Sequence, residues 1–121
     1  MNQESSYSSK RRFQMWGYSV SLGQLLLRSV KTSAQQYRID LLFMNVSAIN
    51  LIPSLDGIAI NVVEPNAVSL PSIVTDALRE RKVYQITTSG FSGYVVALSF
   101  TSHEDEGEYY EPSALLFKGL L

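Results

Sequence analysis

The stretch Tyr37-Arg38-Ile39-Asp40-Leu41-Leu42-Phe43-Met44 carries the clearest β-strand signal in the chain. Its odd-numbered positions are all apolar, which is the period-2 pattern that places alternate side chains on opposite faces of a sheet. The first half has one polar face, made by Arg38 and Asp40, whereas the second half is apolar on both faces. We therefore expect this strand to enter the interior partway along, with Arg38 and Asp40 as a surface ion pair of no functional weight.

Strand signals continue on both sides of this stretch. An aromatic-rich run and an apolar run precede it and are joined by a short connector with a glycine, which predicts a β-hairpin. Further strands are expected downstream, one of them a strand or a bend and the last an edge strand that begins near a proline. These segments are residues 13–20, 24–30, 46–52 (strand or bend), 58–63, 83–88, 94–101 and 109–117 (edge).

One segment has helical spacing. Leu70, Ile73, Val74, Ala77 and Leu78 follow the i, i+3, i+4, i+7, i+8 pattern of a helix with one apolar face. A serine one residue before this segment is a suitable N-cap, and the basic residues at its end suit the negative end of the helix dipole. The pattern predicts one helix near residues 70–81.

The order of these elements indicates the fold class. Six to eight short strands and one helix, without strand–helix alternation, argue against a doubly wound parallel sheet. We expect a mainly β protein (α+β by strict count), in which a single antiparallel sheet curls into a barrel or a sandwich. Residues 1–10 lack apolar periodicity and predict a flexible leader, followed by a single β-rich domain over residues 11–121.

Composition removes several kinds of chemistry. The 121 residues include no cysteine and one histidine, so disulfides, thiolate nucleophiles and zinc–thiolate sites are excluded. No glycine-rich nucleotide-binding loop occurs, and we predict no cofactor, metal site or catalytic residue. The polar N-terminus is not followed by the apolar run of a secretory signal, which favours a cytoplasmic protein, and no apolar run reaches the length of a membrane span.

Charge is unevenly distributed along the chain. Residues 1–44 hold six basic and two acidic side chains, a net charge of +4, whereas residues 45–121 hold four basic and nine acidic side chains, a net charge of −5. The whole chain has a net charge of −1. Such an asymmetry can steer a charged partner or favour head-to-tail association.

The only histidine lies in the acidic run His103-Glu104-Asp105-Glu106-Gly107-Glu108, which precedes Tyr109-Tyr110. These residues could in principle bind a divalent metal or form an acid–base pair, but the run lacks the spacing of a calcium loop or a zinc helix. A solvated loop between strands is the better interpretation. Because exposed tyrosine is enriched at protein interfaces, we interpret His103, Glu104, Asp105, Glu106, Glu108, Tyr109 and Tyr110 as an interaction surface.

Two other motifs have plain structural interpretations. The segment Lys10-Arg11-Arg12-Phe13-Gln14-Met15-Trp16-Gly17-Tyr18 combines cations and rings, as single-stranded nucleic-acid platforms do. A sequence pI near 5.7 instead favours a charged leader that runs into a core strand, so nucleic acid is not the expected partner. Gly90-Phe91-Ser92-Gly93 falls one residue short of a nucleophile elbow and is typical of a hairpin loop.

The stretch Phe13-Gln14-Met15-Trp16-Gly17-Tyr18-Ser19-Val20-Ser21, continued by Gln24-Leu25-Leu26-Leu27-Arg28-Ser29 and Arg38-Ile39-Asp40-Leu41-Leu42-Phe43, is similar to small uncharacterised bacterial β-rich proteins of about this length. The resemblance covers roughly the first third of the chain. It implies no activity and no catalytic residues. Arg28 and Asp40 are polar residues within otherwise apolar strands, which indicates a buried ion pair or a binding pocket.

These observations lead to one main functional hypothesis and two alternatives. The main one is a non-catalytic domain that binds a protein partner or a second copy of itself, as an accessory or immunity-like factor does, with no membrane contact. The first alternative is a small-molecule-binding β-barrel with a pocket near Trp16, Arg28 and Arg38. The second is an enzyme that uses the acidic run.

Overall fold

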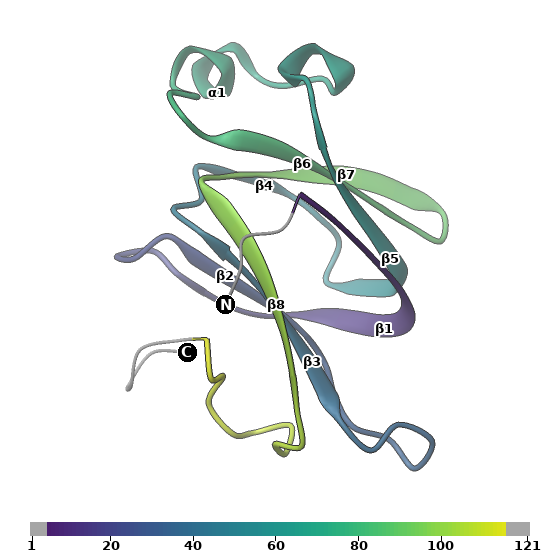
Figure 1. The fold of residues 1–121 in the computed structure, drawn as a ribbon. Coiled ribbons are helices and arrows are strands. Elements are labelled where there is room, and N and C mark those ends of the chain that lie inside the picture. Colours follow the sequence, from purple (N-terminus) through teal and green to yellow (C-terminus); the bar gives the residue numbers. More distant parts are fainter. Residues whose placement is uncertain (1–4, 116–121) are drawn as a thin grey trace.

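One antiparallel sheet of eight strands makes up most of the protein in a computed structural model that describes residues 5–115 (Figure 1). The spatial order is β4-β7-β6-β5-β1-β2-β3-β8. The mainly β fold class predicted from the sequence is thereby confirmed. The strands are β1 (Ser6–Ser19), β2 (Gln24–Ser29), β3 (Arg38–Met44), β4 (Ala48–Asn50), β5 (Ser54–Val63), β6 (Lys82–Thr88), β7 (Phe91–Ala97) and β8 (Ser99–Asp105).

The sheet curls so that its two ends approach each other, but it is not closed. β7 passes directly into β8 at Leu98, and β3 passes into β4 through residues 45–47. Two backbone hydrogen bonds join these bends, from Leu98 N–H to Met44 O and from Ser47 N–H to Val96 O, each 2.9 Å long. The single strand predicted over residues 94–101 is therefore two strands, because at Leu98 the chain leaves β6 and pairs with β3 instead.

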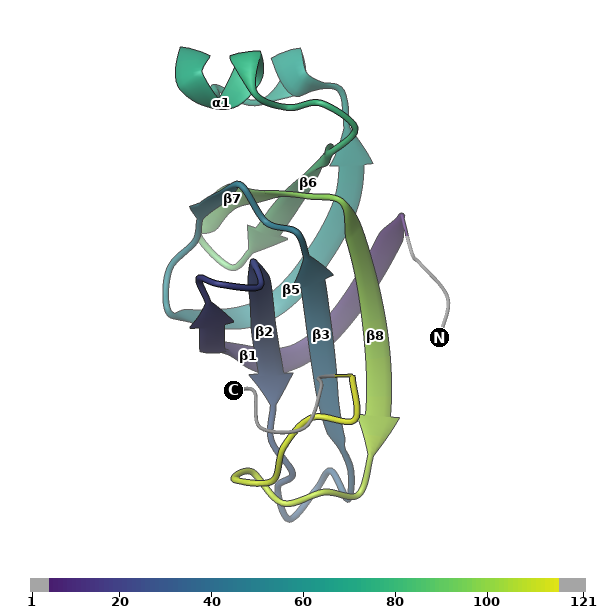
Figure 2. The same ribbon diagram turned by 90° about the vertical axis from the view of Figure 1, so that its left-hand side faces the viewer.

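The core lies between the two halves of the curled sheet (Figure 2). Among the described residues, fifteen buried ones form its main cluster, which includes three rings in mutual contact. The ring centroids of Phe43 and Phe100 are 4.8 Å apart, and those of Phe43 and Tyr84 are 5.4 Å apart. Such aromatic pairs add about 0.5–1.5 kcal/mol each beyond their area burial. Among the described residues, no helix is long and apolar enough to cross a membrane.

The predicted helix over residues 70–81 is far shorter in the structure. A 3₁₀ turn at Pro65–Ala67 precedes α1 (Ser72–Asp76), which has Pro71 at its N-cap and ends before Arg79 at φ 55°. β-branched residues in so short a segment give little helix stability. The apolar spacing indicates part of the packing, because Leu70, Val74 and Leu78 lie against the small buried cluster of Val83, Tyr94 and Val96. It fails for Ile73, which is 77 % exposed, and for Ala77, which is also exposed.

Both ends of the described chain differ from the sequence-based expectation. β1 begins at Ser6 rather than near residue 11, because residues 6–9 pair with β5 and Tyr7 directs its ring against Phe13 and Phe100. The acidic run is also part strand, since β8 continues to Asp105 along β3. Residues 106–115 form turns rather than the predicted edge strand over 109–117, of which residues 116 and 117 lie outside the described part.

The short edge strand β4 depends on a glycine in β7. A Cβ atom on Gly93 would lie 1.9 Å from the backbone oxygen of Asn50. Although alanine normally suits a strand better than glycine, we predict that Gly93→Ala lowers the free energy of unfolding by about 1–3 kcal/mol through overpacking. Urea unfolding measures this, with exposed Ser92→Ala as the control. Equal stability of the two variants would contradict the packing described.

Candidate functional site

The face of β2 and β3 that points away from the core is unusual because it is also buried. All six residues of β2 and the first six of β3 are buried. The strand register places Gln14, Arg28, Asp40 and His103 in one row across β1, β2, β3 and β8. Charged side chains on a buried face must find partners, because an unpaired buried charge costs several kcal/mol.

Arg28 and Asp40 form a two-pronged ion pair in this row. Arg28 Nε donates to Asp40 Oδ1 at 2.7 Å, and Arg28 Nη2 donates to Asp40 Oδ2 at 3.1 Å. Both side chains are 1 % exposed. The third arm of the guanidinium, Nη1, donates to the backbone oxygen of Tyr109 at 2.7 Å, while the ring of Trp16 lies 5.2 Å from Arg28 Cζ. Of the two alternatives expected at Arg28 and Asp40, a buried ion pair or a binding pocket, the structure shows the ion pair.

Arg38 is likewise buried, so the prediction that it forms a surface ion pair with Asp40 is wrong. Its Nε donates to Asp105 Oδ1 at 2.5 Å, and Nη2 donates to Asp105 Oδ2 at 3.3 Å. The remaining donors bind three backbone oxygens, those of Glu108 and Glu111 at 2.7 Å and that of Pro112 at 2.9 Å. The error arises because Asp40 already pairs with Arg28 across the strands, while Asp105 lies opposite Arg38 on β8.

Residues 106–115, which we call the strap, cross over β2 and β3 on this outer face (Figure 2). Three cations hold the strap by its backbone: Arg28 and Arg38 as described, and Lys31, whose Nζ donates to Glu106 O at 2.9 Å and to Glu108 Oε1 at 3.0 Å. Five backbone oxygens of the strap, on Glu106, Glu108, Tyr109, Glu111 and Pro112, thus accept hydrogen bonds from cations. Hydrogen bonds to charged donors contribute about 1.5–3 kcal/mol each.

Gly107 lets the strap approach this closely. A Cβ atom on Gly107 would lie 2.5 Å from Arg38 Cζ. The Gly107 N–H donates to Asp105 Oδ1 at 2.9 Å. The strap therefore provides a hydrogen-bond donor for the carboxylate of Asp105 as well as acceptors for the guanidinium of Arg38.

The network shifts the ionisation of Arg38 and Asp105 toward the charged forms. Burial alone would raise the pKa of Asp105, but hydrogen bonds from Arg38 and the Gly107 N–H, with the charges of Arg38 and His103, lower it below its usual value. Burial would lower the pKa of Arg38, yet the hydrogen bond to Asp105 and the charges of Asp40, Asp105 and Glu111 raise it. Both groups therefore favour the ion pair at neutral pH.

The strap turns two tyrosines outward. Tyr109 is 58 % exposed and Tyr110 is 69 % exposed, and their rings meet edge to face with centroids 5.3 Å apart. The Tyr109 ring also contacts the Trp16 ring edge to face at 6.5 Å. The two tyrosine rings of the strap and the Trp16 ring of β1 therefore form a connected row, in which Trp16 lies over the guanidinium of Arg28. Exposed carboxylates of Glu104, Glu106, Glu108 and Glu111 lie along the same part of the chain.

The structure brings together the residues of both predicted sites. Of the interaction surface, His103, Glu104 and Asp105 lie on β8, with His103 Nε2 3.6 Å from Asp105 Oδ2, while Glu106, Glu108, Tyr109 and Tyr110 lie on the strap. The three residues of the predicted pocket join the same cluster, but Arg28 and Arg38 direct their donors at carboxylates and strap carbonyls. Among residues 5–115 no three histidine or carboxylate side chains are placed to hold a metal ion.

Lys31, Gly107 and the backbone oxygens of the strap are parts of the site that the sequence did not indicate. Arg38 and Asp105 are separated by 67 positions, and no local pattern indicates which strands pair. The sequence offered one indication of this site. Arg38 and Asp40 are two positions apart, as are His103 and Asp105, and this spacing places both members of each pair on the same face of a strand. Comparison with protein-family models, with curated proteins and with solved structures finds no match.

The lowered pKa of Asp105 predicts acid-sensitive stability. The contribution of ionised Asp105 to the free energy of unfolding is present when the pH is above the ordinary aspartate pKa of 3.8. This contribution is lost as the pH falls through the lower pKa of Asp105 in the folded state. We predict that Asp105→Asn, allowing for partial exposure, costs about 1–2 kcal/mol at pH about 7 and less at pH about 3, where the loss of the contribution has begun.

Urea unfolding at the two pH values measures this difference. Glu104→Gln is the control, because this neighbouring carboxylate is exposed and has no hydrogen bond or ion pair within residues 5–115. The interpretation would be refuted if Asp105→Asn and Glu104→Gln changed stability equally at both pH values.

Proposed function

We propose that this protein is a non-catalytic binding domain that takes a basic segment of a partner protein on its strap. The observation that carries the proposal is the exposed pair Tyr109 and Tyr110 on a backbone whose oxygens are held inward by three cations. Tyrosine and tryptophan supply large contact areas at low entropy cost and dominate binding energy at many interfaces. A strap already fixed by ion pairs loses little further freedom when it binds.

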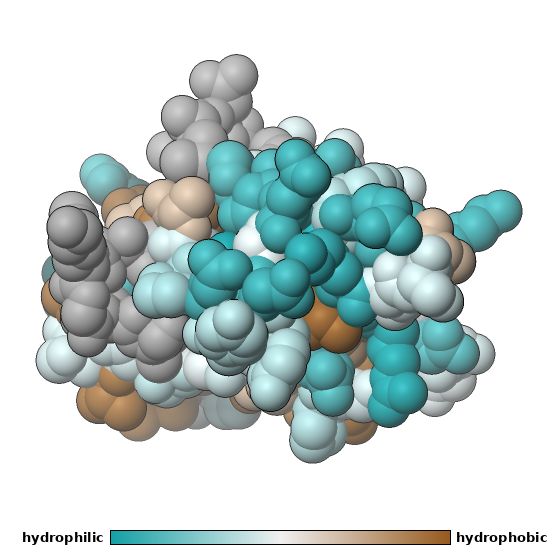
Figure 3. Space-filling model, turned by 90° about the horizontal axis from the view of Figure 1, so that it is seen from below, coloured by the Kyte–Doolittle hydropathy of each residue, from teal (hydrophilic) through white to brown (hydrophobic). Residues whose placement is uncertain are grey.

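Charge and surface character support a basic partner. Four exposed glutamates flank the tyrosines, and Lys31 is the one cation within residues 5–115 that pairs with any of them. The end of the molecule that lies at the bottom of Figure 1 is largely hydrophilic (Figure 3). Lysine and arginine side chains would meet both the carboxylates and the faces of the tyrosine rings. This is the mode of action of an accessory or immunity-like factor that covers a basic face of its partner.

A displayed library of random peptides tests the proposal. We expect the selected peptides to be rich in lysine and arginine and to bind more weakly as salt increases. Tyr110→Ala should weaken their binding by about tenfold or more, as truncation of a hot-spot residue does. Tyr18→Ala, which removes a 40 % exposed tyrosine from another part of the surface, is the matched control.

Two results would contradict this function. Peptides without basic character, or peptides that bind Tyr110→Ala as well as the unaltered protein, would exclude the strap as a site for basic segments. Light scattering tests whether the protein self-associates. We expect no association, because the acidic strap should repel a second copy. A dimer that dissociates when Tyr110 is replaced would show that the strap binds its own chain instead.

A further inference from the structure

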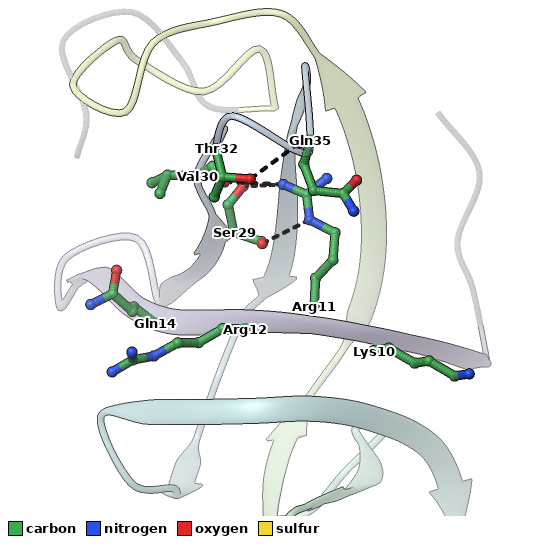
Figure 4. A pocket seen from close by; sticks show the side chains of 8 residues that line it. All are labelled: Lys10, Arg11, Arg12, Gln14, Ser29, Val30, Thr32 and Gln35. Carbon is green, nitrogen blue, oxygen red and sulfur yellow. Dashed lines mark hydrogen bonds between the residues drawn. The ribbon is translucent and has the colours of Figure 1, made fainter.

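A cleft lies on a different part of the surface, between β1 and the loop that joins β2 to β3. Its volume is about 470 Å³, within the range of about 300–1,000 Å³ usual for small-molecule sites. Eight residues line it, three of them basic and none acidic: Lys10, Arg11, Arg12, Gln14, Ser29, Val30, Thr32 and Gln35. Figure 4 shows Arg11 extending from β1 toward the loop, with Lys10 and Arg12 on either side along the strand.

The cleft exists because β1 separates from β2 at this point. β1 pairs with β2 only from Gln14 onward, and its pairing with β5 is shifted between Ser9 and Arg12. Arg11 spans the opening, since its Nε donates to Ser29 Oγ at 3.0 Å and its Nη2 donates to Val30 O at 3.1 Å and to Tyr37 O at 2.8 Å. Arg11 thereby holds the loop in place as one wall of the cleft.

Donors remain available around the cleft. Lys10 is exposed and has no hydrogen bond or ion pair within residues 5–115. Arg12 uses only its Nε, which donates to Ser54 Oγ at 2.8 Å, and it makes no ion pair with Asp56 opposite it on β5 within the same part of the chain. Arg11 Nη1 has no acceptor among the described residues but is buried, so the exposed cations at the cleft are Lys10 and Arg12. Polar side chains of Gln14, Thr32 and Gln35 add neutral donors.

We propose that this cleft binds a small organic phosphate. A phosphate monoester carries close to two negative charges at neutral pH, so it gains more than a singly charged carboxylate from the positive potential that Lys10, Arg11 and Arg12 create at the cleft. Val30 and the aliphatic parts of the basic side chains offer an apolar wall to the organic group.

The distribution of charge favours a compact anion over a nucleic acid. Cations at the cleft belong to one short segment, whereas nucleic-acid-binding proteins present a broad basic face. Lys31, in the same loop, is already paired with Glu108 of the strap, whose other glutamates are also exposed. A long polyanion would meet these carboxylates, but a ligand that fits within the cleft would not.

Isothermal titration with adenosine monophosphate, inorganic phosphate and uncharged adenosine tests the proposal at physiological ionic strength. We expect adenosine monophosphate to bind at a single site and adenosine to bind much more weakly. The double variant Lys10→Gln/Arg12→Gln should weaken binding of adenosine monophosphate by about tenfold or more, since two of the three positive charges at the cleft are lost. The control Arg79→Gln/Lys82→Gln removes the same charge from two exposed positions elsewhere and should leave binding unchanged.

Each alternative result overturns the proposal. Absence of binding by both phosphate probes at millimolar concentration would show that the cleft is not a phosphate site. Equal losses in the two double variants would show that binding reflects overall charge. A single-stranded oligothymidylate that binds far more tightly than adenosine monophosphate, and is lost in Lys10→Gln/Arg12→Gln, would make the surface a nucleic-acid site. Circular dichroism confirms that both variants, altered only at exposed side chains, are folded.

Discussion

The outer face of the protein is organised by the need to neutralise two arginines that β2 and β3 bury. Arg28 is 1 % exposed and Arg38 is 3 % exposed, and each directs a two-pronged contact at one carboxylate, Asp40 or Asp105. Removing such charges from water costs several kcal/mol, which an ion pair offsets only when the remaining donors also find acceptors. Here those acceptors are backbone oxygens of the strap, so neutralising the arginines also determines where the chain runs after β8.

This arrangement links the core of the sheet to the surface that we propose for binding. Because the strap's carbonyl groups turn inward to the cations, its tyrosine side chains turn outward, and the Trp16 ring connects Tyr109 to Arg28. The acidic strap and the basic cleft lie on opposite sides of the loop between β2 and β3. These are the two places that we propose for a basic protein segment and for a compact anion.

Much of the sheet was predictable, whereas most of the strap was not. The alternation of apolar and polar residues located β3 and the strands on either side of it in the sequence. It did so because side chains of a strand with one face in the core must repeat with a period of two. It failed at residues 6–9, where Tyr7 is the only apolar residue and pairing with β5 supplies the strand. It also failed at Leu98, where a change of partner divides one apolar-rich segment into two strands. Arg28 and Asp40 were recognisable as polar residues in apolar strands. The contacts of Arg38 were not, since they join β3 to β8 and to backbone atoms more than sixty positions away.

We conclude that the buried arginines, rather than the strap's own sequence, keep residues 106–115 in place. Backbone ¹⁵N relaxation of the protein with Arg38→Gln tests this directly, because it reports motion residue by residue. We expect the strap to be as rigid as the strands in the unaltered protein and to become mobile in the variant, while β1, β2 and β5 to β7 keep their order. A strap that stays as rigid as the strands without Arg38 would contradict this conclusion.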